Sequence, residues 1–342
     1  MVELNGKKIL VTFLMHLGDL TLTTPFIHAL RKAAPDAHIT MLVDEKLKDV
    51  VLFNPYLDEV VTIDKKGRDN SILSLWACSR HLSKLDFDVL INLHPNERCS
   101  FIDAMTSVKL RTGTTHKIFK WFWDVFTPLD RSMHAADMYL DVLQQLGVQD
   151  LSSNGLEIFP GEEHFLEAEL FWQEQNITDQ DKLIGFNIGS AVPTKRWPPE
   201  RFAEVADIFA AKGYKTVFFG GPMDEEMVAK ATGYMQTRPI IATGHFAIGG
   251  LAAAMRRCCL IITNDSGPMH VAISQKVPIV AMYGPSNPKL YGPYTKDAVI
   301  VTAQPPCQGC ADGMKHSCDD LQCMSRMTVE QVVAAAEKML EK

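Results

Sequence analysis

The stretch that decides the fold is Thr-Asn-Asp-Ser-Gly-Pro-Met-His, residues 263–270. It follows residues 259–262, an apolar run rich in β-branched side chains that predicts a buried strand. It precedes residues 271–274, which predict the first turns of a helix. The polar residues therefore occupy a turn from a strand into a helix.

The residue types in this turn suit an anion site at a helix start. Asp265 or Ser266 can cap the helix, and Gly267 lets the backbone come close to a ligand. Pro268 suits the first helical position because it lacks an N–H group. Free amides and the positive end of the helix dipole attract anions there, although a capped helix that binds nothing would have the same sequence.

Strand-like and helix-like runs alternate on both sides of this turn, which predicts an α/β fold with parallel sheets. In the first half, strands are expected at 8–13, 38–43, 59–63 and 87–93, and helices at 20–34, 46–53, 71–85 and 134–146. In the second half, strands are expected at 183–188, 216–219, 240–241, 260–263 and 278–282, and helices at 199–212, from 224, and at 248–256. We expect two Rossmann-like domains whose ligands bind at the carboxyl ends of strands, in a cleft between them.

The domain boundaries follow from the same pattern. We expect a first domain over 1–160, a linker region over 161–181, a second domain over 182–327 and a carboxyl-terminal helix over 328–342. A length of 342 residues also favours two domains over one.

Composition excludes several classes of function. The net charge is −7, with 17 basic and 20 acidic residues before Pro160 and 17 and 21 from there on, so neither half is a basic nucleic-acid-binding body. The first residues lack a signal-peptide pattern, and no apolar run approaches the roughly 20 residues that span a bilayer. We therefore expect a cytoplasmic protein whose cysteines are mostly reduced.

Three turns of the second half offer groups for a phosphate or nucleotide. Gly189 and Ser190 supply backbone and a hydroxyl, Lys195 and Arg196 supply positive charge, and Gly267 opens the helix described above. Lys195 is the first choice for neutralising a diphosphate, although a solvated loop is the alternative. No pair of metal-binding carboxylates stands beside these turns, so we expect fixed protein charges to do this work.

The first half carries one candidate base. Asp19 follows Gly18 after the first strand, and an aspartate has an unperturbed pKa of about 3.9, so it is ionised at neutral pH. It can accept a proton from an attacking hydroxyl group. The alternative is that Asp19 is the N-cap of a helix that begins at Leu20.

These motifs together resemble glycosyltransferase family 9, which contains the ADP-heptose:lipopolysaccharide heptosyltransferases. The resemblance lies in residues 9–35 with His-Leu-Gly-Asp at 16–19, in Lys-Arg-Trp-Pro at 195–198, in Asn-Asp-Ser-Gly-Pro-Met-His at 264–270 and in Tyr-Gly-Pro-Ser-Asn-Pro at 283–288. It covers nearly the whole chain in the right order.

The resemblance implies a GT-B architecture, with two Rossmann-like domains facing across a cleft, and inverting transfer without a metal ion. It implies that Asp19 is the catalytic base and that Lys195 binds the donor phosphates. It also implies that Asp265, Ser266, Gly267 and His270 form the donor-binding turn, with Asp224 in the turn that commonly meets the nucleoside. The expected donor is ADP-L-glycero-D-manno-heptose, and the expected acceptor is a lipopolysaccharide inner core. A GT-B enzyme with another nucleotide-sugar donor, an epimerase, and a nucleotide-sugar-binding protein without turnover remain the alternatives.

Four cysteines form a second constellation, Cys307-x2-Cys310-x7-Cys318-x4-Cys323. They could hold a structural zinc ion, but the second pair lacks the usual spacing, so reduced thiols or adventitious disulfides are favoured. No other cofactor is expected besides the donor substrate.

Residues 104–123 contain no acidic side chain. They do contain four cations (Lys109, Arg111, Lys117 and Lys120) and four aromatic residues (Phe119, Trp121, Phe122 and Trp123). This pattern suits a surface for the acceptor or for the cytoplasmic face of the inner membrane, whereas a strand and loop that pack their aromatic rings into the core is the favoured alternative.

Overall fold

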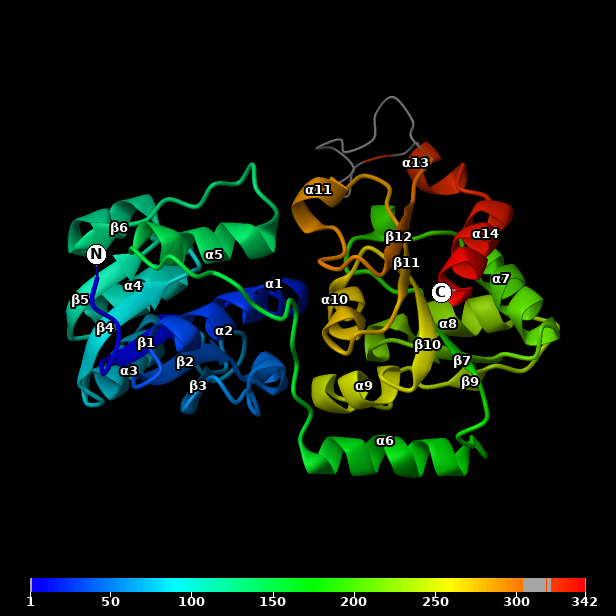
Figure 1. The fold of residues 1–342 in the computed structure, drawn as a ribbon, viewed down its shortest axis with the longest axis horizontal. Helices are drawn as coiled ribbons and strands as arrows, with labels where there is room; N and C mark the ends of the chain where they lie inside the picture. The colour runs from blue at the N-terminus through cyan, green and yellow to red at the C-terminus, as the bar shows by residue number, and fades with distance from the viewer. Residues whose placement is uncertain (1, 304–317, 319–320, 342) are drawn as a thin grey trace. The chain divides into compact units, whose positions relative to one another are not determined.

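The computed structural model describes residues 2–303, 318 and 321–341, and the chain divides into two compact units, Met1–Phe159 and Pro160–Lys342. Figure 1 shows that each unit is built from a sheet with helices packed on it. None of the described helices is both long and apolar enough to cross a bilayer.

Unit 1 contains one six-stranded sheet in the order β3-β2-β1-β4-β5-β6, with every neighbouring pair parallel. Its strands are β1 (Lys8–Thr12), β2 (His38–Asp44), β3 (Glu59–Ile63), β4 (Phe87–Asn92), β5 (Val108–Gly113) and β6 (Val125–Phe126). Its helices are α1 (Leu17–Thr21), α2 (Thr24–Ala33), η1 (Glu45–Val50), α3 (Ile72–Ser83), α4 (Glu97–Met105), η2 (Lys117–Phe122) and α5 (Ala135–Gln145).

Unit 2 contains a second six-stranded parallel sheet in the order β12-β11-β10-β7-β8-β9. Its strands are β7 (Leu183–Asn187), β8 (Lys215–Phe219), β9 (Ile240–Ile241), β10 (Cys258–Asn264), β11 (Ile279–Met282) and β12 (Ala298–Val301). Its helices are α6 (Glu162–Glu174), η3 (Pro193–Lys195), α7 (Pro199–Ala211), η4 (Pro222–Asp224), α8 (Glu225–Thr232), α9 (Ile248–Met255), α10 (Gly267–Ser274), α11 (Pro288–Tyr291), α13 (Gln322–Ser325) and α14 (Val329–Leu340).

The two sheets repeat one topology. When the strands of each unit are counted from its amino end, both orders read 3-2-1-4-5-6. In such a sheet the chain reverses its direction of winding between strands 1 and 4, and ligands bind outside the carboxyl ends of the strands at that point. The predicted α/β class with two Rossmann-like units is confirmed, and the ligand sites are expected at β1/β4 and at β7/β10.

Two details differ from the predicted elements. The helix expected over 20–34 is two helices, because the chain leaves the helical path at Leu22 and Thr23 and α2 restarts with a proline in its first turn. The edge strands β6 and β12 were not predicted, since they have only two and four residues, and β5 was expected only as an unbounded strand within 104–123. Such strands give a weak hydrophobic pattern in the sequence.

Candidate functional site

Two asparagine side chains fix the turns at the β7/β10 edge of unit 2. Asn187 Nδ2, at the end of β7, donates to Thr263 Oγ1 at 2.9 Å and to Ser266 Oγ at 2.8 Å. Asn264 Nδ2, at the end of β10, donates to Ile188 O at 2.7 Å. Turns that are far apart in the sequence are thereby held together, which keeps the site in one shape.

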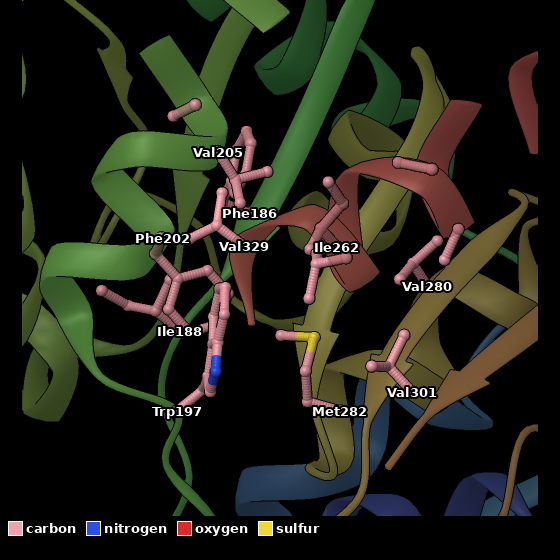
Figure 2. Packing of buried hydrophobic residues seen from close by; sticks show 14 of the residues in the cluster. Phe186, Ile188, Trp197, Phe202, Val205, Ile262, Val280, Met282, Val301 and Val329 are labelled. Carbon is pink, nitrogen blue, oxygen red and sulfur yellow. The ribbon is translucent and has the colours of Figure 1, made fainter. Parts of the chain in front are cut away.

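Trp197 anchors the Lys-Arg-Trp-Pro turn. Its side chain is fully buried beside Phe202, with the two rings edge to face at 5.0 Å, and it lies in the core shown in Figure 2. Its Nε1 donates to Met327 O at 3.1 Å, and its backbone N donates to Asn264 Oδ1 at 3.1 Å. A buried, hydrogen-bonded tryptophan holds its neighbours rigidly, so the position of Lys195 is set by the core.

Lys195 makes an ion pair with Asp265. Its Nζ lies 2.7 Å from Asp265 Oδ2, and the two side chains are 14% and 7% exposed. Ser286 Oγ also donates to this carboxylate oxygen. Burial, and the Asp265 carboxylate next, raise the pKa of the Tyr283 hydroxyl well above its usual value. The sequence predicted both Lys195 and Asp265 for this site, but it did not predict that they pair.

Ser190 and Arg196 shape the turn after β7. Ser190 Oγ donates to Asp265 O at 3.4 Å and accepts from Val192 N at 3.3 Å. Arg196 Nε donates to Ser190 O at 2.8 Å. The alternative of a solvated loop is therefore wrong for Arg196, because its guanidinium group donates to the backbone of the same turn.

The start of α10 differs in detail from the expected cap. Ser266 occupies the N-cap position, but neither it nor Asp265 caps the helix with its side chain, because Ser266 Oγ bonds to Asn187 and Asp265 pairs with Lys195. Gly267 is the first helical residue, so the prediction of Pro268 there is wrong by one position. His270 is buried within the helix.

Gly189 and Asp224 bring two predicted turns into contact. A Cβ atom on Gly189 would lie only 2.1 Å from Asp224 Oδ1, and one on Gly220 would lie 2.9 Å from Asp224 Cβ. Asp224 Oδ2 accepts a hydrogen bond from Gly221 N at 2.9 Å. The carboxylate therefore fits against Gly189 only because glycine has no side chain, and the turns after β7 and β8 form one wall.

Asp19 of unit 1 is the third residue of α1, and Gly18 is the second. The N-cap is His16, so the alternative in which Asp19 caps a helix beginning at Leu20 is wrong. The loop that holds Asp19 leaves the carboxyl end of β1.

Lys65 holds that loop in place. Its Nζ donates to Leu14 O at 2.7 Å and to Met15 O at 2.9 Å, and it pairs with Asp44 Oδ2 at 3.0 Å. The Lys65 and Asp44 side chains are 11% and 7% exposed. A single buried ammonium group therefore ties together the ends of β1, β2 and β3.

A hollow of about 510 Å³ opens beside this loop, at the predicted β1/β4 position. It is lined from the β1 side by Leu14, Met15 and His16, from the β3 side by Lys65, Lys66 and Asn70, and from the β4 side by His94, Asn96 and Arg98. Burial first, then Lys65 and His16, lowers the pKa of His94 to about 4. His94 Nδ1 is buried and finds no hydrogen-bond partner among the described residues. The hollow is thus rich in cations and suits an anionic group.

Sequence reasoning missed Lys65, His94 and Arg98. The available signal was their position, because Lys65 follows β3 and the other two follow β4 at the same edge of a parallel sheet. Asp19 does not line the hollow itself, but His16 does, and His16 is the N-cap of the helix that carries Asp19.

Two of the four clustered cysteines, Cys307 and Cys310, lie outside the described residues, so the zinc site with Cys318 and Cys323 stays a prediction. Cys323 is buried at the start of α13. Within the part of the chain that the structure describes, no three His, Cys, Asp or Glu side chains are arranged to hold a metal ion.

The aromatic segment divides between core and surface. Trp123 is buried, and its Nε1 donates to Thr112 O at 3.0 Å, whereas Trp121 is 96% exposed. Lys109 pairs with Asp88 at 2.7 Å, and Arg111 Nε donates to Asp103 O at 3.0 Å. The favoured core packing is therefore confirmed for Trp123 and wrong for Trp121.

The similarity of this chain to known proteins identifies its family. The model of glycosyltransferase family 9 (heptosyltransferase) matches residues 75–318, well over half of the chain. The chain belongs to glycosyltransferase family 9. It is similar over 99% of its length to a solved family 9 glycosyl transferase from Veillonella parvula DSM 2008, with 53% identity, a TM-score of 0.95 and 99% of that chain covered.

Two further family 9 relatives come from Escherichia coli. ADP-heptose lipopolysaccharide heptosyltransferase II has the same fold at 20% identity, with a TM-score of 0.79 and 98% of each chain covered. Lipopolysaccharide heptosyltransferase 3 of strain K12 is 24% identical, covering 94% of this chain and 95% of the relative. The protein is therefore a glycosyltransferase, and the resemblance stated from its motifs is confirmed.

Proposed function

We propose that this glycosyltransferase moves a heptose from ADP-L-glycero-D-manno-heptose to a lipopolysaccharide inner-core acceptor at the cytoplasmic face of the inner membrane. The transfer inverts the anomeric carbon and uses no metal ion. The observation that carries the proposal is the repeated topology, because the predicted base and the predicted phosphate-binding lysine each lie at the switch point of their own sheet. The names of the Escherichia coli relatives support the choice of sugar and acceptor.

The donor's diphosphate is assigned to the β7/β10 edge. An ammonium group has three N–H donors, and Asp265 engages one side of Lys195, so the others are available to phosphate oxygens. The start of α10 adds its dipole. Asp265 holds Lys195 in place, and the wall formed by Gly189 and Asp224 borders the nucleoside.

The acceptor is assigned to the hollow beside α1. Its cations, Lys65, Lys66 and Arg98, suit the phosphate or carboxylate groups of an anionic saccharide. Because His16 belongs both to this hollow and to the cap of α1, an acceptor bound there lies near the helix that carries Asp19.

The chemistry is a single displacement. An acceptor hydroxyl oxygen forms a bond to the anomeric carbon while the bond from that carbon to the β-phosphate oxygen breaks, and ADP leaves. The hydroxyl proton passes to the Asp19 carboxylate. The sugar passes through an oxocarbenium-like state, and Lys195 with the α10 start stabilises the charge on the leaving diphosphate.

Asp19→Ala tests the base. We expect transfer to fall by roughly a hundredfold or more, because general-base catalysis contributes about that much, while ADP binding measured by calorimetry stays as in the unaltered protein. Lys195→Ala should instead weaken ADP binding. Near-normal transfer by Asp19→Ala would remove Asp19 from this role.

Thermal shifts with ADP, UDP and GDP test the donor, and only ADP should stabilise the protein. A larger shift with UDP or GDP would favour a GT-B enzyme with another donor. Tight ADP binding without any product from lipopolysaccharide acceptors would contradict the proposed transfer.

A further inference from the structure

Six of the large hydrophobic side chains that unit 1 exposes lie on two elements, α3 and η2. On α3 these are Ile72, Leu73 and Trp76, which are 74%, 77% and 52% exposed. On η2 they are Ile118, Trp121 and Phe122, which are 58%, 96% and 45% exposed. Single exposed apolar residues are ordinary, but a group of this size marks an interaction surface. We call these six residues the amphiphilic surface, together with Lys117 and Lys120 between them.

The two elements flank one helix, α4. Ile72, Trp76 and Ser83 lie on the same side of α3, and Ser83 Oγ accepts from Ser107 N, just after α4, at 2.8 Å. At the start of α4, Arg98 donates to Asn70 Oδ1 at 2.7 Å, just before α3.

On the other side of α4, η2 packs against this helix through the ring of Phe119. Phe119 lies edge to face on Phe101 of α4, with ring centroids 6.3 Å apart, and His116 N donates to Ser100 Oγ at 2.8 Å. The exposed residues of α3 and η2 therefore lie on two elements that both pack against α4.

The positive charge of η2 indicates which kind of partner the amphiphilic surface can bind. Lys117 and Lys120 alternate with its apolar residues, Lys120 Nζ lies 4.5 Å from the centre of the Phe126 ring, and residues 104–123 contain no acid. Glu97 at the start of α4 lies 3.9 Å from His116, just before η2. A second copy of the chain would bring like charges together at η2, whereas anionic headgroups complement them.

We infer that the amphiphilic surface binds unit 1 to an anionic lipid bilayer. Tryptophan, isoleucine and phenylalanine side chains enter the boundary between headgroups and acyl chains, and the two lysines extend to the headgroups. Neither a helix that crosses the membrane nor a covalent lipid is needed for such binding.

The surface adjoins the cationic hollow. Arg98 and Asn70 line that hollow and are bonded to each other where α3 and α4 begin. A bilayer held against α3 and η2 therefore presents the saccharide of a lipid-anchored acceptor close to the hollow. This last step rests on the proposed function, while the lipid binding does not.

Vesicle flotation tests the inference directly. The full chain should float with vesicles of phosphatidylcholine and phosphatidylglycerol and much less with phosphatidylcholine alone. The double variant Lys117→Glu/Lys120→Glu should lose roughly tenfold or more in vesicle affinity, since each lysine near an anionic surface contributes about 1 kcal/mol. The apolar double variant Leu73→Ser/Trp121→Ser should lose binding as well.

Matched controls lie on unit 2. Lys230→Glu/Lys338→Glu makes the same change in net charge, and Met223→Ser removes a side chain that is 86% exposed, so both should float like the unaltered protein. Equal flotation of the Lys117→Glu/Lys120→Glu variant, or none by the unaltered chain, would overturn the inference. Self-association that depends on Trp121, without vesicle binding, would assign this face to a second copy instead.

Transfer assays separate this inference from the proposed function. The variants of the amphiphilic surface should keep their rate on a water-soluble, delipidated acceptor and lose rate on the same acceptor embedded in vesicles. No transfer to either acceptor by the unaltered protein, with flotation intact, would contradict the proposed function alone. Equal rates of the variants on both acceptors would contradict the inference alone.

Discussion

Lys65 fixes the loop before α1 in unit 1, and Trp197 fixes the Lys-Arg-Trp-Pro turn in unit 2. Each is a buried side chain that contributes hydrogen bonds to a turn carrying a candidate functional residue. Lys65 binds the two carbonyl groups just before α1, and its charge is balanced by Asp44. Removing one partner of a buried pair leaves an uncompensated charge, which is costly.

Lys65→Met should therefore reduce both stability and turnover. We expect the free energy of unfolding to fall by about 3 kcal/mol, and kcat to fall tenfold or more, with an unchanged KM for the donor because the proposed donor-binding residues lie in unit 2. In Lys65→Met/Asp44→Asn the unpaired charge is gone, so stability should recover while kcat stays low. Recovery of kcat together with stability would show that Lys65 only stabilises the fold.

Asp103 is a buried acid beneath the end of β1. Its Oδ2 accepts from Thr12 Oγ1 at 2.8 Å, and Oδ1 has no partner among the described residues. Burial raises the pKa of this carboxyl group to about 8, from the usual aspartate pKa of 3.8. In the folded protein it is therefore protonated at pH values where the unfolded chain has lost the proton.

The sign of the pH dependence follows from this difference. Between about pH 4 and pH 8 the unfolded chain binds fewer protons at Asp103, so Asp103 lowers stability as the pH rises, by up to roughly 1.4 kcal/mol per pH unit. An asparagine side chain cannot ionise, so Asp103→Asn should make the urea midpoint less dependent on pH. The variant should gain most stability over the unaltered protein near pH 8. Parallel curves for the two proteins would show that Asp103 is not protonated in the fold.

At the scale of elements, the turns after β7 and β8 depend on one close approach. Asp224 occupies the space beside Gly189 and Gly220, and its carboxylate accepts from Gly221 N. The approach allows two consecutive βα turns to form a single wall beside the proposed donor site.

Gly189→Ala should disrupt that wall. The new Cβ would lie 2.1 Å from Asp224 Oδ1, so the turn must shift, and we expect a loss of about 1–3 kcal/mol in stability with weaker ADP binding. Gly221→Ala is the matched control, because its Cβ would meet nothing within 4 Å and its φ is −84°. Equal melting temperatures and ADP affinities for the two variants would contradict the assigned contact.

At the scale of the whole molecule, the chain divides into two compact units. Each has a complete parallel sheet and its own hydrophobic core, and the boundary falls at Phe159 and Pro160. Domains with separate cores commonly unfold in separate steps.

Calorimetry of the full chain should therefore show two transitions. ADP at a hundred times its dissociation constant should stabilise the unit that binds it by about 2.7 kcal/mol, and so raise only one of the two transition temperatures. Gly189→Ala should lower that same transition. A single transition that moves as a whole with ADP would show that the units unfold as one body.

Much of the fold, and the positions of several candidate site residues, could be predicted from local sequence patterns. Gly189, Ser190, Asp265 and Ser266 lie in turns that follow strands, as predicted, because the pattern of apolar runs locates the ends of buried parallel strands. Gly18, Asp19, Gly267 and His270 lie in the helices that follow, and Asp224 ends η4. The roles of Asp19 and Lys195 in transfer remain predictions. The edge strands β6 and β12 escaped detection because runs of two and four residues are too short to show a periodic pattern.

The sequence by itself determined that this chain folds as two α/β units and which polar residues lie in the turns at the ends of their strands. Both properties depend on local periodicity and residue type, which can be read along the chain. Only the tertiary structure decided that Lys195 pairs with Asp265, that Asp224 fits against Gly189 and that Lys65 holds the loop before α1. Those contacts join residues that the crossovers of a parallel sheet bring together across dozens of positions, and nothing in the local sequence encodes which partners meet.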